Sequence, residues 1–415
     1  MREETPIVGL DVGTSKVVAV VGVVQEGIIH ITGLGKAPNA GLRKGTVVDI
    51  DETVSAISSA IDDAQTSSGF EISSCLASIS GNQIVSVDSM GVIAVSRADG
   101  EIQETDIERV IDSANSVALP PNLEILHSIP KTFIVDGQSE IRDPIGMSGI
   151  RLEVLSQVVG ATVSSIKNLS KSISQSGLEI NGIVFAPLAC AKAYLNKKQK
   201  EIGSMIVDIG CSNTAIAVFE ENTLIHTKVI PIGSNHITND IAIGLKISID
   251  AAEKIKINEI EVSSDSVDEN KKLDLSKYEK GESDTPTVKY VCEIADARLS
   301  ELFGMIKDEL KSIERDEMLP AGAVLVGGGA KLKGIQQFVK KALNLPVQIG
   351  IPVFEVSGIV DKIDDPEYST AVGLVLWGID ESSSNVSNRT KIGIDISRLR
   401  NPLSRIKEIF KNLIP

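Results

Sequence analysis

The sequence predicts an α/β protein built from one duplicated fold, with a small α+β domain inserted into it and an amphipathic helix at its C-terminus. Three observations predict this architecture. Two similar stretches, 7–22 and 204–220, each indicate two apolar strands joined by a tight polar turn. The segment between them, 83–161, changes its hydrophobic rhythm. Residues 401–415 place apolar and basic side chains on opposite faces of a helix.

Length and composition bound the possible functions. With 415 residues, 42% of them hydrophobic, the chain is long enough for several domains with large cores. A net charge of −15 and an aromatic content of 3% argue against binding to nucleic acid. The acidic N-terminus does not fit a signal peptide, and no apolar run reaches transmembrane length. We therefore expect any membrane contact to be peripheral.

The cysteines and histidines indicate no metal or catalytic site. The four cysteines are scattered without a CxxC pair, so we expect buried free thiols in a reducing cytosol: Cys75, Cys190, Cys211 and Cys292. The four histidines show neither a triad nor a metal-binding spacing, and we expect them on strands or at the surface.

The turn of the first hairpin has the composition of a phosphate-binding loop. Gly13 lets backbone N–H groups approach a phosphate, and Thr14 and Ser15 offer hydroxyl donors. Lys16 would neutralise charge. Asp11 could hold Mg²⁺ through water, because this ion prefers carboxylate oxygens and keeps several waters. Taken alone, such a turn is more often an ordinary hairpin.

The second hairpin repeats this plan, with Asp208 at the position equivalent to Asp11. Its turn supplies a second set of small donors: Gly210, Cys211, Ser212, Asn213 and Thr214. Further along, 321–326 predicts a buried strand that ends in the glycines 327–329. These would leave a surface smooth enough for a base or ribose, although three glycines alone more often mark a close helix–strand contact.

The remaining elements follow from periodicity and punctuation. Within the insertion we expect a strand at 91–96, then a helix opened by Thr105 with Glu108 completing a capping box. Strand-like stretches follow at 123–137 and 150–162. The chain then predicts a helix, a strand and a helix, at 163–177, 179–185 and 187–194. The charge-mixed run 259–286 predicts an exposed loop, and a last helix at 369–378 precedes a linker of serines and asparagines.

The C-terminal stretch NPLSRIKEIFKNLIP predicts a membrane-surface helix. Asn401 is a good N-cap and Pro402 a good first-turn residue. The apolar face gathers Leu403, Ile406, Ile409, Phe410, Leu413 and Ile414, and the polar face includes Arg405, Lys407 and Lys411. At about 20 Å the helix is too short to span a bilayer, so we expect it to lie on the surface.

Charge and apolar burial both favour a lipid surface for this helix. Residues 385–415 hold seven Lys or Arg against two acids, so this end carries +5 and the remainder −20. Each basic residue near an anionic leaflet contributes about 1 kcal/mol, whereas burying a Leu, Ile or Phe contributes about 1.5–3 kcal/mol. The alternative, a core helix docked on the body, is disfavoured by the linker ahead of it.

The order of these motifs resembles the actin-like ATPase superfamily, which includes actin, sugar kinases and the 70-kDa heat-shock chaperones. The inserted domain and the tail narrow the resemblance to the FtsA family of bacterial cell-division proteins, over essentially the whole chain. The stretches LIHTKVIPIGSNHITNDIA, VLVGGGAKLKGI and YSTAVGL strengthen it. The implied boundaries are domain 1A in 1–82 and 162–197, inserted domain 1C in 83–161, domain 2A in 198–233 and 305–360, domain 2B in 234–304, a closing helix in 361–380, a linker in 381–396 and a membrane-targeting helix in 397–415.

The resemblance implies that ATP and Mg²⁺ bind in a cleft between two actin-like halves. One side of the phosphates would meet Asp11, Gly13, Thr14, Ser15 and Lys16, and the other side Asp208, Gly210, Ser212, Asn213 and Thr214. Gly328 and Gly329 would contact the nucleoside, and Glu253 and Lys256 would approach the ribose and base. Without the resemblance, Glu253 and Lys256 are more simply a solvated ion pair.

Two departures from the superfamily pattern predict that ATP is bound well and hydrolysed slowly. Ala186, before Pro187, stands where active members tend to carry a water-orienting Glu or Gln. Cys211 and Ser212 replace glycines of the second turn, and each added side chain restricts how near the backbone comes to a phosphate. We therefore assign no catalytic residue and expect the nucleotide to act as a conformational ligand.

The resemblance also implies partners. The chain would polymerise on the inner face of the cytoplasmic membrane and anchor the tubulin-like protein FtsZ there, together with other division proteins. Arg298 and Glu301 match the family's helix that binds the FtsZ C-terminal peptide, although such a pair is more often solvated. The competing functions are a metabolite kinase, which would need a general base near the cleft, and an actin-like scaffold of a pilus-assembly machine.

Overall fold

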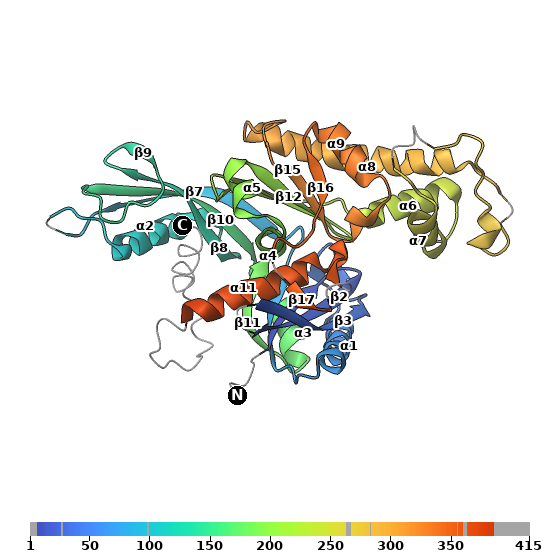
Figure 1. Ribbon diagram of the computed structural model, residues 1–415, viewed down its shortest axis with the longest axis horizontal. Helices are drawn as coiled ribbons and strands as arrows, with labels where there is room; N and C mark the ends of the chain where they lie inside the picture. The colour runs from blue at the N-terminus through green and yellow to red at the C-terminus, as the bar shows by residue number, and fades with distance from the viewer. Residues whose placement is uncertain are drawn as a thin grey trace.

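The computed structural model describes residues 6–25, 28–97, 99–262, 267–282, 284–354, 356–359 and 363–385. They form two α/β halves with a sheet each, an inserted domain at one end of the molecule and a helical subdomain at the opposite end (Figure 1). Among the helices described, none is both long and apolar enough to cross a membrane.

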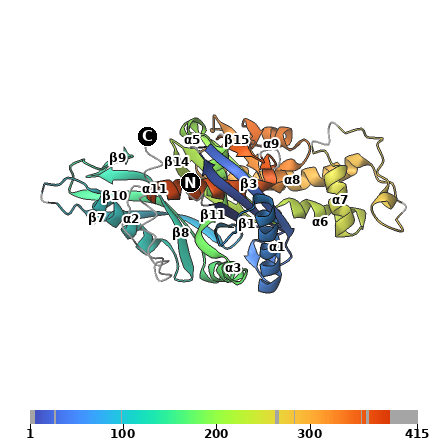
Figure 2. The same cartoon turned by 60° about the horizontal axis from the view of Figure 1, so that its bottom comes forward.

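The first half is built on a six-stranded sheet with the order β11-β6-β1-β2-β3-β17. Its strands are β1 (Ile7–Val12), β2 (Lys16–Gln25), β3 (Ile28–Pro38), β6 (Ser74–Ile79), β11 (Glu179–Phe185) and β17 (Val356–Gly358). Helices α1 (Ile50–Ser68) and α3 (Val163–Gln175) cover one face, and both lie at the lower edge of the molecule in Figures 1 and 2. A ribbon of β4 (Leu42–Arg43) and β5 (Thr46–Val47) precedes α1.

Helix α1 has clear capping residues at both ends and packs closely against β3 of the sheet. The Asp49 side chain accepts a hydrogen bond from the backbone N–H of Glu52, and the helix ends at Gly69, whose φ of 74° suits glycine. A Cβ added to Gly35 of β3 would lie 1.8 Å from the carbonyl oxygen of Ala60. Only glycine therefore lets α1 approach β3 this closely.

The second half repeats the first strand for strand. Its sheet has the order β14-β13-β12-β15-β16, which corresponds to β3-β2-β1-β6-β11 with the same parallel and antiparallel pairings. The strands are β12 (Ser204–Ile209), β13 (Thr214–Glu220), β14 (Thr223–Ile230), β15 (Gly322–Val326) and β16 (Val347–Ile349). Helices α5 (Lys197–Ile202) and α9 (Ile335–Leu343) complete this half. The predicted duplication is confirmed.

Two helices, α4 (Ala186–Tyr194) and α11 (Ser369–Asn385), lie between the halves. They touch closely, since a Cβ added to Gly373 would lie 2.1 Å from the carbonyl oxygen of Ala189. Apolar side chains of both sheets join one core around them, among them Val18, Val20, Ile206, Ala217 and Val324. Helix α11 runs beyond the predicted end at 378 and into the segment predicted as a linker.

The inserted domain is an antiparallel sheet with one helix on its face. Its strands are β7 (Ile84–Ala94), β8 (Leu123–Val135), β9 (Gln138–Ile141) and β10 (Arg151–Thr162), in the order β7-β10-β8-β9. The predicted helix cap, Thr105, is wrong by two residues. Helix α2 (Glu104–Ala118) begins after Gln103, whose backbone N–H donates to the Asp106 carboxylate at 3.1 Å, because Asp106 rather than Glu108 reaches back to the cap.

One ring contact joins the inserted domain to the helices between the halves. His127 of β8 is 6% exposed, and its Nε2 accepts a hydrogen bond from the backbone N–H of Phe185 at 3.0 Å. Its ring lies 5.7 Å from that of Trp377 in α11. This buried histidine therefore helps to hold the inserted domain against α11 and the end of β11.

The helical subdomain consists of α6 (Ser234–Leu245), α7 (Ile249–Asn258) and the first turns of α8 (Val288–Ser312). The polar run predicted to be an exposed loop is partly packed here. Its apolar residues Ile260, Val262, Leu273 and Leu275 are all buried in the core of the second half. A few apolar anchors thus fix a segment whose average composition indicates a loop.

Candidate functional site

The turns of the two hairpins face each other and touch. Thr14 Oγ1, in the first turn, lies 2.9 Å from Ser212 Oγ in the second. Nearby, the Ser80 hydroxyl after β6 donates to Asn213 Oδ1 at 3.4 Å. Polar groups of two segments almost 200 residues apart in the sequence therefore meet at one site between the two halves.

The backbones of the two turns are equivalent. The N–H of Gly13 donates to the carbonyl oxygen of Lys16, and the N–H of Gly210 donates to that of Asn213, each at 3.0 Å. A Cβ at either glycine would lie 2.9 Å from the same acceptor. The glycines are therefore needed for the tight turn itself, a reason different from the approach to a phosphate for which Gly13 was predicted.

Asp11 and Asp208 end β1 and β12 at equivalent positions and lie close enough to repel each other. Burial raises the pKa of Asp11, while a hydrogen bond donated by Ser78 at 2.6 Å opposes that rise. Burial, with the nearby charge of Asp11, raises the pKa of Asp208 to about 7. Two recessed carboxylates in this relation favour a bound cation or a shared proton.

The glycine-rich turn after β15 closes onto the second aspartate. Gly327 has φ 81°, and a Cβ there would lie 2.4 Å from Asp208 Oδ1. A Cβ at Gly329 would lie 2.2 Å from Ile209 Cγ2, so this glycine permits a close contact with β12. Gly328 is exposed, and a Cβ there would have Lys16 Nζ at 3.9 Å as its neighbour. Of the three glycines, Gly328 is thus the one open to a ligand.

Lys16 and Thr214 already have protein partners. The Lys16 ammonium forms an ion pair with Glu367, and the Thr214 hydroxyl donates to the carbonyl oxygen of Ile232 at 2.8 Å. Thr214 is fully buried, whereas Ser15 is exposed at the tip of its turn. Among the predicted hydroxyls, those of Thr14, Ser15 and Ser212 are therefore the better placed for a ligand.

Glu253 and Lys256 lie on α7, next to the second turn. Lys256 is 7% exposed, and its ammonium lies 2.7 Å from Glu253 Oε2 and 2.8 Å from Thr238 Oγ1 of α6. Both charges act on Cys211 in the turn, whose thiol has a raised pKa chiefly because of burial. The solvated ion pair that composition alone favoured does not describe this buried ammonium.

Several residues at the site escaped prediction. Ser78 holds Asp11, the Asn39 side chain donates to the carbonyl oxygen of Gly13 at 2.8 Å, and Glu367 pairs with Lys16. Each reaches the first turn only because of the order of strands and helices, which local sequence does not reveal. The motif YSTAVGL, one residue after Glu367, was the nearest signal.

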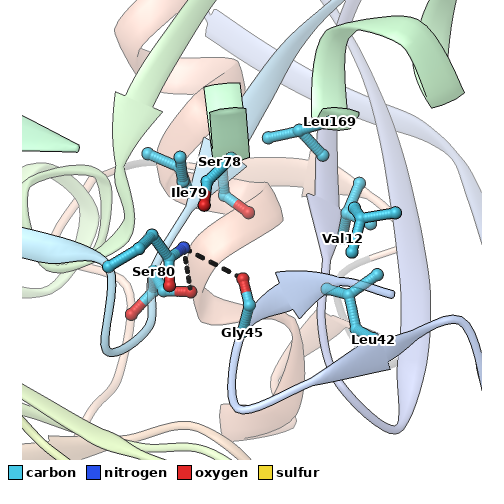
Figure 3. Close-up of a pocket in the computed structure, with 10 residues that line it drawn as sticks. Val12, Leu42, Gly45, Ser78, Ile79, Ser80 and Leu169 are labelled. Carbon is cyan, nitrogen blue, oxygen red and sulfur yellow. Dashed lines mark hydrogen bonds between the residues drawn. The ribbon is translucent and has the colours of Figure 1, made fainter. Parts of the chain in front are cut away.

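A small hollow lies behind the first turn (Figure 3). Val12, Leu42, Ile79 and Leu169 form its apolar wall. On the other side, the Gln83 amide donates to the carbonyl oxygens of Gly45 at 2.9 Å and Ser80 at 3.4 Å. The bond to Gly45 fixes the segment after β6 against the turn between β4 and β5.

The predicted partner residues form a network on α8. Arg298 Nε and Nη2 donate to the two carboxylate oxygens of Asp240 in α6 at 2.6 and 2.9 Å, and Nη1 donates to Glu301 at 2.5 Å. The Arg298 side chain is 25% exposed, and these hydrogen bonds hold its guanidinium between the two helices.

Two further predictions have different outcomes. All four cysteines are free, as expected. The expected burial holds for Cys75, Cys190 and Cys292, whereas Cys211 is only half-buried. The membrane helix falls outside the described residues, together with its nine assigned positions: Leu403, Arg405, Ile406, Lys407, Ile409, Phe410, Lys411, Leu413 and Ile414.

Solved structures of low sequence identity share this fold. The PilM-PilN type IV pilus biogenesis complex aligns with a TM-score of 0.66 and 15% identity, covering 91% of this chain and 99% of that one. MreB 5 of Spiroplasma citri bound to AMPPNP aligns with a TM-score of 0.55 and 12% identity, covering 92% and 99%. The predicted actin-like fold is confirmed.

Sequence comparison narrows the family. A model described as "Cell division protein FtsA" matches residues 205–373, and one described as "SHS2 domain inserted in FTSA" matches 81–160. Cell division protein FtsA of Pseudomonas aeruginosa is 38% identical over 393 residues, covering 92% of this chain and 91% of the relative. That of Bacillus subtilis is 37% identical over 375 residues, covering 90% and 84%. With the duplicated sheets and the inserted domain, these identities show that the chain belongs to the FtsA family of actin-like cell-division proteins.

Proposed function

We propose that this chain is an ATP-binding scaffold of the division machinery that polymerises on the inner face of the cytoplasmic membrane and anchors FtsZ there. The contact between Thr14 and Ser212 supports this function most strongly. It joins two equivalent turns over two carboxylates, which is the arrangement that donors on both sides of a triphosphate require. A neighbour of the same fold is described as bound to AMPPNP.

The residues around the two turns fit a magnesium nucleotide. Asp11 and Asp208 would hold Mg²⁺ through water, and the charge of the ion would offset the burial and the repulsion by Asp11 that raise the pKa of Asp208. When bound, Mg²⁺ supplies positive charge to the phosphates. Thr14, Ser15 and Ser212 would donate to phosphate oxygens, with Lys16 as counter-charge. The backbone at Gly328 would face the nucleoside.

We expect hydrolysis to be slow, on the order of 10⁻³ per second, as in unassisted GTPases. The reason is the position before Pro187, where α4 begins with Ala186, an alanine 1% exposed that cannot orient a water. Steady-state phosphate release from purified protein, with and without lipid, measures this rate. Rapid turnover that is lost in Asp208→Ala would contradict it.

The FtsZ peptide would bind along the contact between α6 and α8. Arg298 lies at one end of this contact, and Gly244 of α6 lies against Ile294 and Tyr290 of α8 at the other. Ile243, one turn after Asp240 on α6, is 76% exposed. A fixed guanidinium beside an exposed apolar side chain suits a peptide with acidic and apolar residues.

Arg298→Glu and Ile243→Ser are each expected to weaken binding of an FtsZ C-terminal peptide at least about tenfold, because the first removes the fixed guanidinium and the second removes the exposed apolar side chain that the peptide would contact. Fluorescence anisotropy with a labelled peptide measures this. Ile257→Ser is the matched control, since Ile257 of α7 is also an exposed isoleucine, at 60%. Equal affinity of all four proteins would contradict the assignment.

Reconstitution tests the whole function. Anionic liposomes, ATP, FtsZ and the full chain are mixed, and FtsZ on the membrane is measured by co-sedimentation and microscopy. We expect recruitment of FtsZ by the full chain and none by Arg298→Glu. Failure of the folded full chain to bring FtsZ to the membrane would refute the anchoring function.

The competing functions are less well supported. A metabolite kinase needs a general base at the acceptor hydroxyl, and α4 begins with alanine at the position before Pro187. A pilus scaffold shares the fold through the PilM complex, but at 15% identity that likeness extends to the fold alone.

A further inference from the structure

A cluster of charged side chains lies beside the glycine-rich turn. Glu367, in the short helix η4 (Pro366–Tyr368), stands at its centre. Its Oε2 pairs with Lys16 of β2, and its Oε1 accepts a hydrogen bond from Lys36 of β3 at 2.7 Å. Lys331, at the end of η3 (Gly328–Lys331), lies 3.8 Å from the same Oε2 and pairs with Asp365. One carboxylate thus serves three ammonium groups.

This cluster connects the two halves next to the first turn and the glycine-rich turn. Lys16 and Lys36 belong to the first sheet, whereas Lys331 follows the glycine-rich turn of the second half. The backbone N–H of Gly327 donates to the carbonyl oxygen of Pro366 at 2.9 Å, which fixes η4 against that turn. A change in the ion pairs of Glu367 would therefore alter contacts to both halves.

The Glu367 carboxylate is ionised and has more than one cationic partner. Its side chain is 10% exposed, and hydrogen bonds from Lys16 and Lys36 outweigh the effect of burial and lower its pKa to about 2. If the Lys16 ammonium left, Lys36 would remain at 2.7 Å and Lys331 at 3.8 Å. The free-energy cost of losing one of several partners is far smaller for a buried charge than the cost of losing its only partner.

We propose that Glu367 is a positioning residue for nucleotide binding, which holds Lys16 until a nucleotide enters and then releases it to a phosphate. Lys331 then moves onto the vacated Oε2. Lys16 exchanges one anion for another, and Glu367 exchanges a lysine of the first half for a lysine of the second. The phosphate thereby tightens the ion pair between Lys331 of η3 and Glu367 of η4. This inference rests on the proposed nucleotide site and adds a residue that senses its occupancy.

Glu367→Gln keeps the shape of the side chain and removes its charge. Since Lys16 no longer leaves an ionised partner, and one negative charge near the phosphates is gone, we expect the Kd for ATP to fall about tenfold. Lys331→Met should raise that Kd about threefold to tenfold in the wild-type background and leave it unchanged in Glu367→Gln. Adenosine, which carries no phosphate, should bind equally to all variants.

Binding is measured by anisotropy of a fluorescent ATP analogue, with unlabelled ATP and adenosine as competitors. Lys333→Met is the matched control, because Lys333 is an exposed lysine of the same turn, two positions further on. Thermal unfolding checks that each variant folds. If Glu367→Gln does not fold, the Lys331→Met shift for ATP without one for adenosine still tests the exchange.

Two results would overturn the inference while leaving the nucleotide site intact. One is ATP affinity that is unchanged or reduced in folded Glu367→Gln. The other is an equal effect of Lys331→Met in both backgrounds, which would mean that the two residues act independently. By contrast, a folded wild-type chain that binds no ATP refutes the proposed function itself.

Discussion

Asp208→Asn is expected to stabilise the empty protein above pH 7 and, at the same time, to weaken binding of Mg-ATP at least about tenfold. The carboxylate has a pKa of about 7 in the folded chain, because burial and the charge of Asp11 disfavour its ionised form. In the unfolded chain its value is 3.8. The folded state therefore binds more protons than the unfolded state between these values, and stability falls as pH rises through this window.

The Asp208→Asn variant has no carboxylate at this position, so its stability does not fall in this way as pH rises. Its advantage over wild type in free energy of unfolding should grow from near zero at pH 4 to at most about 4 kcal/mol at pH 8, from a shift of roughly three units. Urea unfolding at several pH values measures the difference. Asp62→Asn, at an exposed position of α1, is the control and should show no such trend. An advantage of equal size at pH 4 and pH 8 would show that the carboxylate is not perturbed.

Removal of residues 397–415 is expected to abolish co-sedimentation with anionic liposomes while ATP binding is retained. The apolar face of the predicted helix supplies most of the binding, since burying one Phe or Ile contributes about 1.5–3 kcal/mol and one basic charge about 1 kcal/mol. Single substitutions should therefore differ. Phe410→Ser should weaken liposome binding more than tenfold, and Lys411→Ser only about fivefold.

Sedimentation with liposomes of increasing anionic content separates these two terms. The charge effect should shrink at high salt, whereas the effect at Phe410 should persist. Persistent sedimentation of the truncated chain would refute the assignment of the tail, and equal effects of both substitutions would refute the dominance of the apolar face.

The hairpins and the duplication could be predicted because their signals are local. An aspartate near the end of an apolar strand, followed by glycine and small hydroxyls, specifies a turn whose hydrogen bonds lie within a few residues. The two turns repeat that pattern, and the strand order confirms that they are equivalent. Their places in the two repeated patterns were therefore sufficient to predict that Asp11 and Asp208 are equivalent.

The partners of these residues could not be predicted, because sheet order brings them together. Ser78 reaches Asp11 through the parallel pairing of β6 with β1, and Glu367 reaches Lys16 across more than 350 residues. Similarly, composition indicated a loop at 259–286, but Leu273 and Leu275 pack into the second half. The ion pair of Arg298 with Asp240 also escaped prediction, because Asp240 lies on another helix.

The ring contact between His127 and Trp377 makes the molecule its own spectroscopic reporter. Trp377 is the one tryptophan of the chain, so its emission comes from a single place, where the inserted domain meets α11. An unlabelled sample would thus register any shift of that domain through the quenching of one indole.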